Sequence, residues 1–596
     1  MKKINRQGFS FIEILVSVAI FAILALAIYQ ITLAATKVVE EARLIVASAA
    51  VANEQLEIIH NLAYADVGLL NGIPAGRIQP TLNITRSNIN FSINFYIRNI
   101  DDPFDGTLGG TPNDLSPADY KLVQMDISVP ADPKFKPISY TEYIAPKNLE
   151  NSTTNGALFV RVFNANGQPI QGANVHVVNN SVTSTININD TTNDSGILEI
   201  VDVPPSVGAY QISVSKAGYS SDQTYAIGTP GNPNPTKPNA TVVMQQVTQI
   251  SFAIDRVSNL TVESLTNTCV PIGNMGFHLS GSKQIGTSPI VLKYQSDFST
   301  DAGGIQNIPN LEWDSYNLSL SSGSYDLAGT IPLEPFDLAP NSLQDLKVVL
   351  TPHHPESLMV SVKQGGTQLP LTGATVTLQG NGSSTDLITG RGSLRQTDWS
   401  GGPGQANYID ATKFYDSDGQ AEISNPAGEV KLRLTNGLYS NSAVLTSSSF
   451  DTGSASNFYQ ISTLPQDQPA QTGPNSVRLQ LATNNDNNTW NFVGPDGTAG
   501  TYYSPINTNI NAIHNGNRYL RYRLYLQTAS TTYTPDVSEV NFTFSSNCVP
   551  SGQAMFSSLS SGNYQLTVTK AGYQTSTEAL SLSSAWQSHE VILMPQ

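Results

Sequence analysis

A single carboxylate lies at the start of the most apolar stretch of the chain. Residues 7–13 read Gln-Gly-Phe-Ser-Phe-Ile-Glu, and the run from Ile14 to Thr36 that follows contains no charged residue. That run is long enough to cross a hydrocarbon core of ~30 Å. An unpaired charge in lipid costs at least ~2.5 kcal/mol. Glu13 therefore needs a cationic partner, and the sequence predicts that its chemistry is charge neutralisation at a membrane.

A short leader with three positive charges precedes Gly8. Together with the glycine, the acid and the apolar run, it resembles the class III signal of type IV prepilins and type II secretion pseudopilins. In that family a membrane peptidase cuts after the glycine and methylates the new N-terminus. The resemblance implies cleavage between Gly8 and Phe9, an N-methylated Phe9, and a Glu13 that faces the N-terminal amine of a neighbouring subunit.

A plain signal peptide or signal anchor is the alternative reading of the same stretch. An ordinary signal peptide has an apolar core of about 7–15 residues and a small-residue cleavage site after it. Here the apolar run is longer, and the only nearby glycine precedes it. A plain anchor would have no use for Glu13, because ionisable residues inside membrane segments are usually functional.

Composition limits the remaining possibilities. The chain has 596 residues and a formal net charge of −16, which allows about four domains of ~150 residues. The acidic balance disfavours nucleic acid as a partner. The two cysteines, Cys269 and Cys548, are too few for a disulfide framework. They leave open one long-range bridge or two separate thiols.

The first 150 residues predict a long helix followed by a small sheet. Neither proline nor glycine interrupts residues 9–61, so we expect one helix over 9–62 whose first half spans the membrane. Residues 63–150 contain strands with period-two alternation, as in 90–97 and 121–129. A sheet packed on the outer half of the helix resembles a minor pilin, with residues 1–8 as its leader.

The chain repeats itself after residue 150. Gly-Ala-Tyr-Gln before Lys-Ala-Gly-Tyr at 208–219 returns as Gly-Asn-Tyr-Gln before Lys-Ala-Gly-Tyr at 562–573, and a looser copy contains Gly-Ser-Tyr at 323–325. We expect each Gly-x-Tyr step to begin a strand whose aromatic ring faces a core. These units resemble carboxypeptidase regulatory-like and collagen-adhesin B-type modules, which are Ig-like β-sandwiches. The expected sandwiches are 156–248, 249–352, and 356–380 joined with 548–596.

The third copy is split by residues 381–547. Such a segment is too long for a loop in a compact domain, and it shows strand patterning and turn residues that are weakly similar to jelly-roll or carbohydrate-binding modules. The expected fold class is therefore mainly β with one long N-terminal helix: a pilin-like α+β domain, serial Ig-like sandwiches and an inserted jelly-roll-like β domain.

The inserted segment carries the candidate ligand-binding residues. Tryptophan rings can stack on sugars, and clustered arginines can hold a sugar acid or another anion. Core positions for the tryptophans and an ordinary exposed strand for the arginines are the alternatives. The candidates are Trp399, Trp490, Arg518, Arg521 and Arg523.

No catalytic or cofactor motif stands out. His353-His354-Pro355-Glu356 lies at a module junction between prolines, which does not preorganise a zinc site. Short acidic turns such as Asp416-x-Asp418 would suit calcium, although Asx turns explain them without metal. We expect no enzyme activity, no cofactor and no metal site.

Taken together, the sequence predicts a non-enzymatic, minor-pilin-like subunit of a type IV pilus or related filament that presents β-sandwich modules for surface adhesion. The resemblance implies a prepilin peptidase and other pilin subunits as partners, with a surface glycan or protein as a further candidate. The expected location is the inner (cytoplasmic) membrane, crossed once, and then an extracellular filament. A type II secretion pseudopilin and a membrane-anchored glycan-binding accessory protein or hydrolase remain alternatives.

Overall fold

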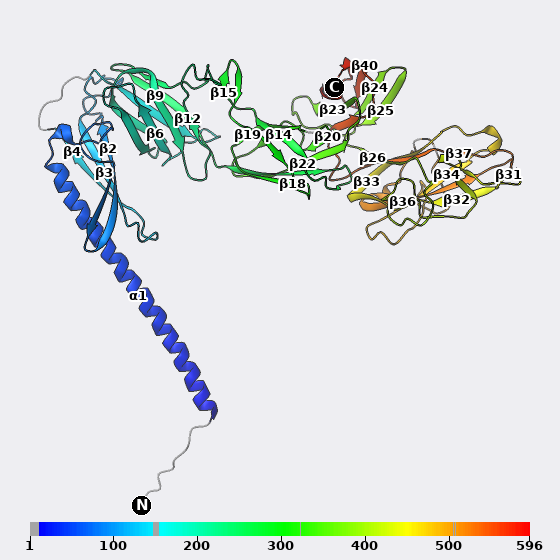
Figure 1. Ribbon diagram of the computed structural model, residues 1–596, viewed down its shortest axis with the longest axis horizontal. Helices are drawn as coiled ribbons and strands as arrows, with labels where there is room; N and C mark the ends of the chain where they lie inside the picture. Colours follow the sequence, from blue (N-terminus) through cyan, green and yellow to red (C-terminus); the bar gives the residue numbers. More distant parts are fainter. Residues whose placement is uncertain (1–10, 147–153, 322, 505, 507, 584) are drawn as a thin grey trace, which may run out of the picture. The chain divides into compact units, whose positions relative to one another are not determined.

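One long helix precedes a chain whose other regular elements are β-strands and short 3-10 turns (Figure 1). The computed structural model describes residues 11–146, 154–321, 323–504, 506, 508–583 and 585–596. The chain divides into two compact units, Met1–Arg256 with Gln284–Val291, and Val257–Lys283 with Leu292–Gln596. Helix and β-sandwich content confirm the predicted fold class.

Helix α1 covers Phe11–His60, and the short 3-10 turn η1 covers Tyr64–Asp66. No proline or glycine lies within α1, so nothing removes a backbone hydrogen bond from its ladder. Fifty residues at ~1.5 Å each make a rod of about 75 Å. Buried residues occur only in its C-terminal part, beginning at Leu44, among the side chains that the structure describes.

A four-stranded antiparallel sheet covers the C-terminal part of α1. Its strands follow chain order: β1 (Thr81–Arg86), β2 (Ile89–Ile100), β3 (Tyr120–Ser128) and β4 (Ile138–Ile144). Burial alternates along β2 and β3, as period-two side-chain geometry requires. Val51 and Ile59 of the helix share one core with Phe95 and Met125 of the sheet.

The first sandwich completes the first unit. One sheet has the order β12-β5-β8, and the other has the order β10-β9-β6-β7 with β11 paired to β9. A two-stranded ribbon of β15 and β16 accompanies it. The strands are β5 (Gly156–Phe163), β6 (Asn174–Asn179), β7 (Ile186–Thr191), β8 (Ile197–Val203), β9 (Ser206–Ser215), β10 (Asp222–Gln223), β11 (Ala240–Val242), β12 (Val247–Ala253), β15 (Gln284–Thr287) and β16 (Ile290–Leu292).

The second sandwich belongs to the second unit. Its sheets have the orders β18-β13-β22-β20 and β17-β14-β19-β21. The strands are β13 (Ser258–Leu265), β14 (Gly276–Gly281), β17 (Gln295–Ser299), β18 (Ile305–Leu311), β19 (Asp314–Leu320), β20 (Tyr325–Ile331), β21 (Phe336–Leu338) and β22 (Leu343–Pro352).

The third sandwich is assembled from two separated stretches of chain. Its sheets have the orders β39-β23-β42 and β25-β24-β40-β41. The two strands that pair with β23 both come after the inserted domain in the sequence. This sheet can therefore form only once the chain beyond the inserted domain is available. The strands are β23 (Ser357–Gln364), β24 (Thr375–Gly380), β25 (Ser383–Ile388), β39 (Gln553–Phe556), β40 (Gly562–Thr569), β41 (Ser576–Leu582) and β42 (Trp586–Leu593).

The third sandwich extends past residue 380, where the sequence pattern placed its boundary. β25 pairs in antiparallel register with β24 across the two residues Asn381 and Gly382. Both have positive φ, 49° and 77°, which is the backbone of the tight Asn-Gly hairpin turn. The turn therefore continues the sandwich, and the inserted strands begin at β26.

The three sandwiches share one plan. The first strand of each pairs in parallel with its last strand: β5 with β12, β13 with β22, and β23 with β42. Each also buries a tyrosine whose hydroxyl donates to a nearby carbonyl oxygen: Tyr210 to Pro204 at 2.6 Å, Tyr316 to Glu312 at 2.8 Å and Tyr564 to Ser560 at 2.9 Å. In the second sandwich this residue is Tyr316 rather than Tyr325 of the predicted Gly-x-Tyr step, which is only partly buried.

The inserted domain is built around an eight-stranded sheet. Its path is β26-β38-β33-β36-β32-β27, with β34 paired to β36 and β35 to β33. A three-stranded sheet, β28-β29-β37, shares its core, and β30 with β31 forms a separate hairpin. The elements are β26 (Gly392–Gln396), β27 (Asp416–Ser417), β28 (Ala421–Ser424), β29 (Ala427–Leu432), β30 (Leu434–Thr435), β31 (Leu438–Tyr439), β32 (Ser442–Thr446), β33 (Phe450–Leu464), η2 (Ala470–Thr472), β34 (Val477–Asn484), β35 (Thr508–Asn509), η3 (Ala512–His514), β36 (Asn517–Gln527), β37 (Asp536–Val537) and β38 (Glu539–Ser545).

Candidate functional site

Within the part of the chain that the structure describes, nothing covers the apolar N-terminal part of α1. Phe21 is 73% exposed and Ile31 is 68% exposed. The helix from Val18 to His60 has a window of mean hydropathy 2.3 with none of its residues buried, and it is long and apolar enough to cross a membrane. Apolar surface of this size requires lipid or other helices around it.

The predicted processing residues, Gly8 and Phe9, lie outside the described residues. Glu13 lies in the first turns of α1. It therefore stands where the helix begins, before the uncovered apolar surface. Its pairing with an amine stays a prediction.

Trp399 is buried and cannot contact a ligand at the surface, so its prediction as a ligand-binding residue is wrong. Its ring is fully enclosed in the core of the inserted domain, and its indole N–H donates to the Tyr522 hydroxyl at 2.8 Å. Tyr522 in turn donates to the Gln396 side-chain oxygen at 2.6 Å. Burial raises the pKa of Tyr522, so its hydroxyl stays a donor. Trp399 thus orders a buried hydrogen-bond chain.

Arg521 is not an open anion site either. Only 5% of the residue is exposed, and its guanidinium carbon lies 4.1 Å from the ring centre of Tyr415 and 4.5 Å from that of Trp490. Its Nη2 donates to the Ala406 carbonyl oxygen at 2.8 Å. Burial lowers the pKa of Arg521. Trp490 and Arg521, both candidates for ligand binding, contact each other, so the guanidinium is occupied by the indole ring of its own chain.

The other two arginines have separate surroundings. Arg523 lies 3.9 Å from the ring centre of Phe492, and its Nε donates to Thr446 Oγ1 at 3.3 Å. Arg518 pairs with Asp451 through two hydrogen bonds of 2.7 and 2.9 Å. Arg518 therefore does not join the other two in one site.

A row of arginine–aromatic contacts, which sequence reasoning missed, runs along β34 and β36. Arg478 on β34 lies 4.5 Å from the ring centre of Tyr502, beside the Arg523–Phe492 and Arg521–Trp490 contacts. The sequence signal is a matched two-residue spacing, 521 and 523 on a strand and 490 and 492 on the segment that covers it. Each such contact contributes about 0.5–2 kcal/mol. The row holds the covering segment on the sheet.

The acidic turns satisfy their own carboxylates. Asp418 accepts from the Gln420 and Val444 backbone N–H groups, both at 2.9 Å. Asp496 accepts from the backbone N–H and hydroxyl of Thr498 at 2.8 and 2.9 Å. The backbone contacts to Gln420 and Thr498, two residues after each aspartate, are Asx turns, and the Val444 contact comes from a neighbouring strand. Within the described part of the chain, no group of three or more His, Cys, Asp or Glu side chains could hold a metal ion.

Cys269 and Cys548 form a disulfide in the second unit, with a Cα–Cα distance of 5.4 Å. The sequence left this pairing open. The bond joins the loop after β13 to the residues after β38, across a sequence separation of 279. Leu265 and Val349 pack with it in a small apolar cluster. It therefore ties the exit of the inserted domain to the second sandwich.

Removing this bond should destabilise the second unit markedly. We expect the double variant Cys269→Ser/Cys548→Ser to lose roughly 2–5 kcal/mol of unfolding free energy, because the unfolded chain regains the freedom of a long loop. All four tryptophans lie in the second unit, so tryptophan fluorescence in urea reports on this unit alone. Reductant should shift the wild-type midpoint and leave the double variant unmoved. An unchanged wild-type midpoint in reductant would show that the bond contributes nothing.

Comparison with known proteins gives two matches to protein families. Residues 3–29 match the prokaryotic N-terminal methylation motif, and residues 157–255 match the carboxypeptidase regulatory-like domain. The chain therefore begins with a prepilin-type signal and contains a regulatory-like sandwich, which confirms the resemblance seen in the sequence. The second match covers the first sandwich almost from end to end. No curated protein matches the chain.

Solved structures with local similarity include two pilins. The Bacillus anthracis TIE protein is 12% identical over 53% of this chain and 67% of its own, with a TM-score of 0.15. The minor pilin GBS52 of Streptococcus agalactiae is 13% identical over 34% of this chain and 99% of its own, with a TM-score of 0.17. The shaft pilin SpaA of Lactobacillus rhamnosus GG is 15% identical over 34% and 98%, with a TM-score of 0.14. At these scores the likenesses carry no argument about function.

Proposed function

We propose that the chain is a minor-pilin-like subunit of a type IV pilus or related filament, and that its β modules serve surface adhesion. The observation that carries the proposal is the uncovered apolar half of α1, which begins inside the matched methylation motif of residues 3–29. Before assembly this half lies in the cytoplasmic membrane. After assembly the helices of other subunits take the place of lipid.

The apolar N-terminal half of α1 can be stable both in lipid before assembly and among other helices in the filament. Burying apolar area is favourable by about 25 cal/mol per Å², whether lipid tails or other helices supply the cover. The sheet β1–β4 covers one face of the C-terminal half of α1, while Val39 and Val46 on that half stay 69% and 70% exposed. The N-terminal half is exposed throughout the side chains that the structure describes, and we expect its partners to be the prepilin peptidase at the cut and other pilin subunits in the filament.

Exposed apolar side chains on the inserted domain support the adhesive role. Leu434 and Leu438, on the hairpin β30–β31, are 55% and 52% exposed. The two side chains lie on opposite faces of the hairpin, because Leu434 pairs with Tyr439 and Leu438 pairs with Thr435, so each would offer its own apolar contact to a partner. The proposed receptor is a glycan or a protein on the surface to which the cell attaches.

Electron microscopy of surface filaments with this subunit labelled tests the filament assignment. We expect label on filaments outside the cell, at their ends or at sparse positions, because over 400 residues of β modules do not suit a closely packed rod. Label confined to the cell envelope, with no label on extracellular filaments, would contradict the pilus and favour a pseudopilin.

Deleting the inserted domain should reduce attachment without stopping assembly. Replacing residues 392–545 by a short Gly/Ser linker keeps β25 and Cys548, so the third sandwich and its disulfide retain all their parts. Loop length costs only ~0.6 kcal/mol per doubling. We expect filaments in normal number and a several-fold drop in attached cells in a surface-binding assay.

Two further variants make the adhesion test specific. Leu434→Asn with Leu438→Asn should lower attachment in part, while Val207→Ser, at an apolar residue of the first sandwich that is even more exposed (87%), should not. Unchanged attachment together with failed assembly of the deletion variant would make the insert structural and refute the adhesive role.

A further inference from the structure

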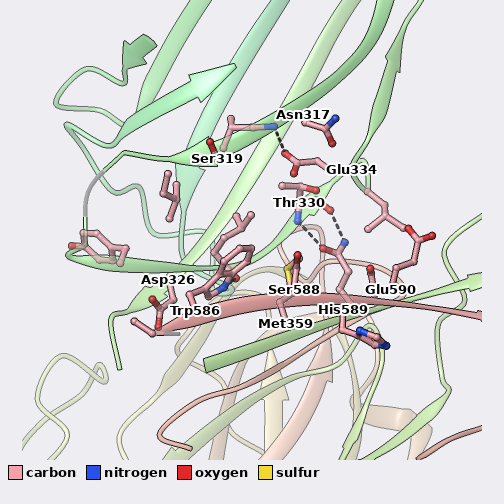
Figure 2. Close-up of a pocket in the computed structure, with 18 of the residues that line it drawn as sticks. Asn317, Ser319, Asp326, Thr330, Glu334, Met359, Trp586, Ser588, His589 and Glu590 are labelled. Carbon is pink, nitrogen blue, oxygen red and sulfur yellow. Dashed lines mark hydrogen bonds between the residues drawn. The ribbon is translucent and has the colours of Figure 1, made fainter. Parts of the chain in front are cut away.

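A cavity of about 520 Å³ lies between the second and third sandwiches, inside the second compact unit (Figure 2). Its walls come from β19 and β20 on one side and from β23 and β42 on the other. Small-molecule sites typically have volumes of about 300–1,000 Å³. Its apolar lining consists of Leu318, Leu320, Leu327, Leu333, Met359 and Trp586.

Hydrogen bonds between the two sandwiches fix the shape of this cavity. The Gln553 side chain accepts from the Thr330 N–H at 3.0 Å and donates to the Thr330 carbonyl oxygen at 2.8 Å. The Trp586 indole N–H donates to the Leu327 carbonyl oxygen at 2.9 Å. These bonds join residues of both sandwiches, so the site is formed before a ligand enters.

Most of the charged side chains that line the cavity already have partners. Asp326 accepts from His353 Nδ1 at 2.7 Å and from the Ser357 hydroxyl at 2.6 Å. On β42, His589 Nε2 lies 2.7 Å from a Glu578 carboxylate oxygen. Glu590, also on β42, forms an ion pair of 2.5 Å with Lys363. These contacts stabilise the walls.

Glu334 differs from them. It lies on one wall, with Trp586 and Met359 on the opposite wall (Figure 2). Its carboxylate accepts the Leu318 backbone N–H at 3.2 Å, which fills one of about four acceptor positions. Burial raises the pKa of Glu334 to about 8, and the Leu318 hydrogen bond opposes that rise. A partly buried acid with spare acceptor capacity thus faces a cavity lined by apolar side chains and by polar ones such as Ser361 and Ser588.

We propose that the cavity binds a small primary amine with an apolar, preferably aromatic, body: the ammonium group pairs with the Glu334 carboxylate, and the body packs on Trp586 and Met359. A cation restores the favourable interactions that the carboxylate loses on dehydration. Tryptophan and methionine offer the polarisable contacts that suit an aromatic ring. The site is independent of the filament function proposed above.

Ligand binding should be linked to proton release. Free Glu334 is mostly protonated at pH 7, and the ammonium ligand requires the ionised form. From pH 6 to pH 8 the affinity should therefore rise about 50-fold, as expected for a group with a pKa of about 8. His353 and His589 also line the cavity. A variant must therefore separate their contribution from that of Glu334.

Calorimetry with 2-phenylethylamine and the full-length chain in nanodiscs tests the proposal, with empty nanodiscs as the blank. At pH 7, titrations in buffers of different ionisation heat should show release of about 0.9 proton per bound amine. The neutral analogue 2-phenylethanol should bind at least 10-fold more weakly, because it cannot form the charged hydrogen bond. Absence of amine binding, equal binding of the alcohol, or no proton release would each overturn the proposal.

Glu334→Gln should weaken amine binding by roughly 10- to 100-fold and abolish most of the proton release. Asp345→Asn removes an exposed carboxylate from the same sandwich, outside the cavity, and should change neither. Unaltered urea midpoints would show that both variants fold. Proton release that persists in Glu334→Gln would assign the linkage to the histidines and refute the role of Glu334.

Discussion

Glu13→Val should leave the chain in the membrane and prevent its entry into filaments. The substitution removes the one charge at the start of the apolar run, so anchoring should be at least as strong. The N-terminal amine of a neighbouring subunit would then lack its partner. An ion pair at about 4 Å in an effective dielectric of about 20 contributes about 4 kcal/mol, or about a thousandfold in an assembly equilibrium.

Fractionation of sheared filaments and membranes measures this effect. The matched control is Glu40→Gln, on the same helix but beyond the apolar run, where the residue is exposed. It should assemble like the unmodified chain. If Glu13→Val reached the filament fraction at the level of the control, Glu13 would have no part in assembly.

Gly8→Leu should block processing outright. The resemblance to prepilins implies a cut directly after this glycine, and we expect that a bulky side chain there would not fit a peptidase site shaped for glycine. We expect the variant to accumulate in the membrane with its leader attached, and to disappear from sheared filaments. Intact-mass measurement distinguishes the two forms.

Gly8→Ala supplies the graded control for this experiment, because alanine is nearly as small as glycine. It should be processed in part. Normal processing of Gly8→Leu would show that the cut lies elsewhere and would remove the prepilin reading of the leader.

Local sequence signals predicted the elements that depend on short-range physics. The absence of Pro and Gly predicted α1, and strict alternation predicted β2 and β3. The Asn381-Gly382 turn was readable in the same way, since Asn-Gly between alternating strands is a strong hairpin signal. The sequence analysis instead assigned residue 381 and everything up to 547 to the inserted domain, so the turn was not recognised as part of the third sandwich.

Positions that depend on long-range packing could not be predicted. Trp399 is buried because Tyr522, far along the chain, offers its indole a hydrogen-bond partner. The two cysteines meet only because the inserted domain returns the chain to the second sandwich. Tyr316 rather than Tyr325 fills the core, because its strand pairs with β14 as β9 pairs with β6. None of these contacts leaves a local pattern.

The cavity was invisible to sequence reasoning for the same reason. The whole inserted domain and most of the third sandwich lie between Glu334 and Trp586 in the sequence, and neither residue lies in a recognisable motif. Only the pairing of β23 with β42 brings Trp586 next to the second sandwich. Sites between repeated modules therefore require the structure.

Mass spectrometry of the mature N-terminus tests the central claim most directly. The chain purified from sheared surface filaments should yield a first peptide that begins with N-methylated Phe9. An intact Met1, or a first residue beyond the apolar run that ends at Thr36, would contradict the assignment of this chain as a processed, prepilin-type filament subunit.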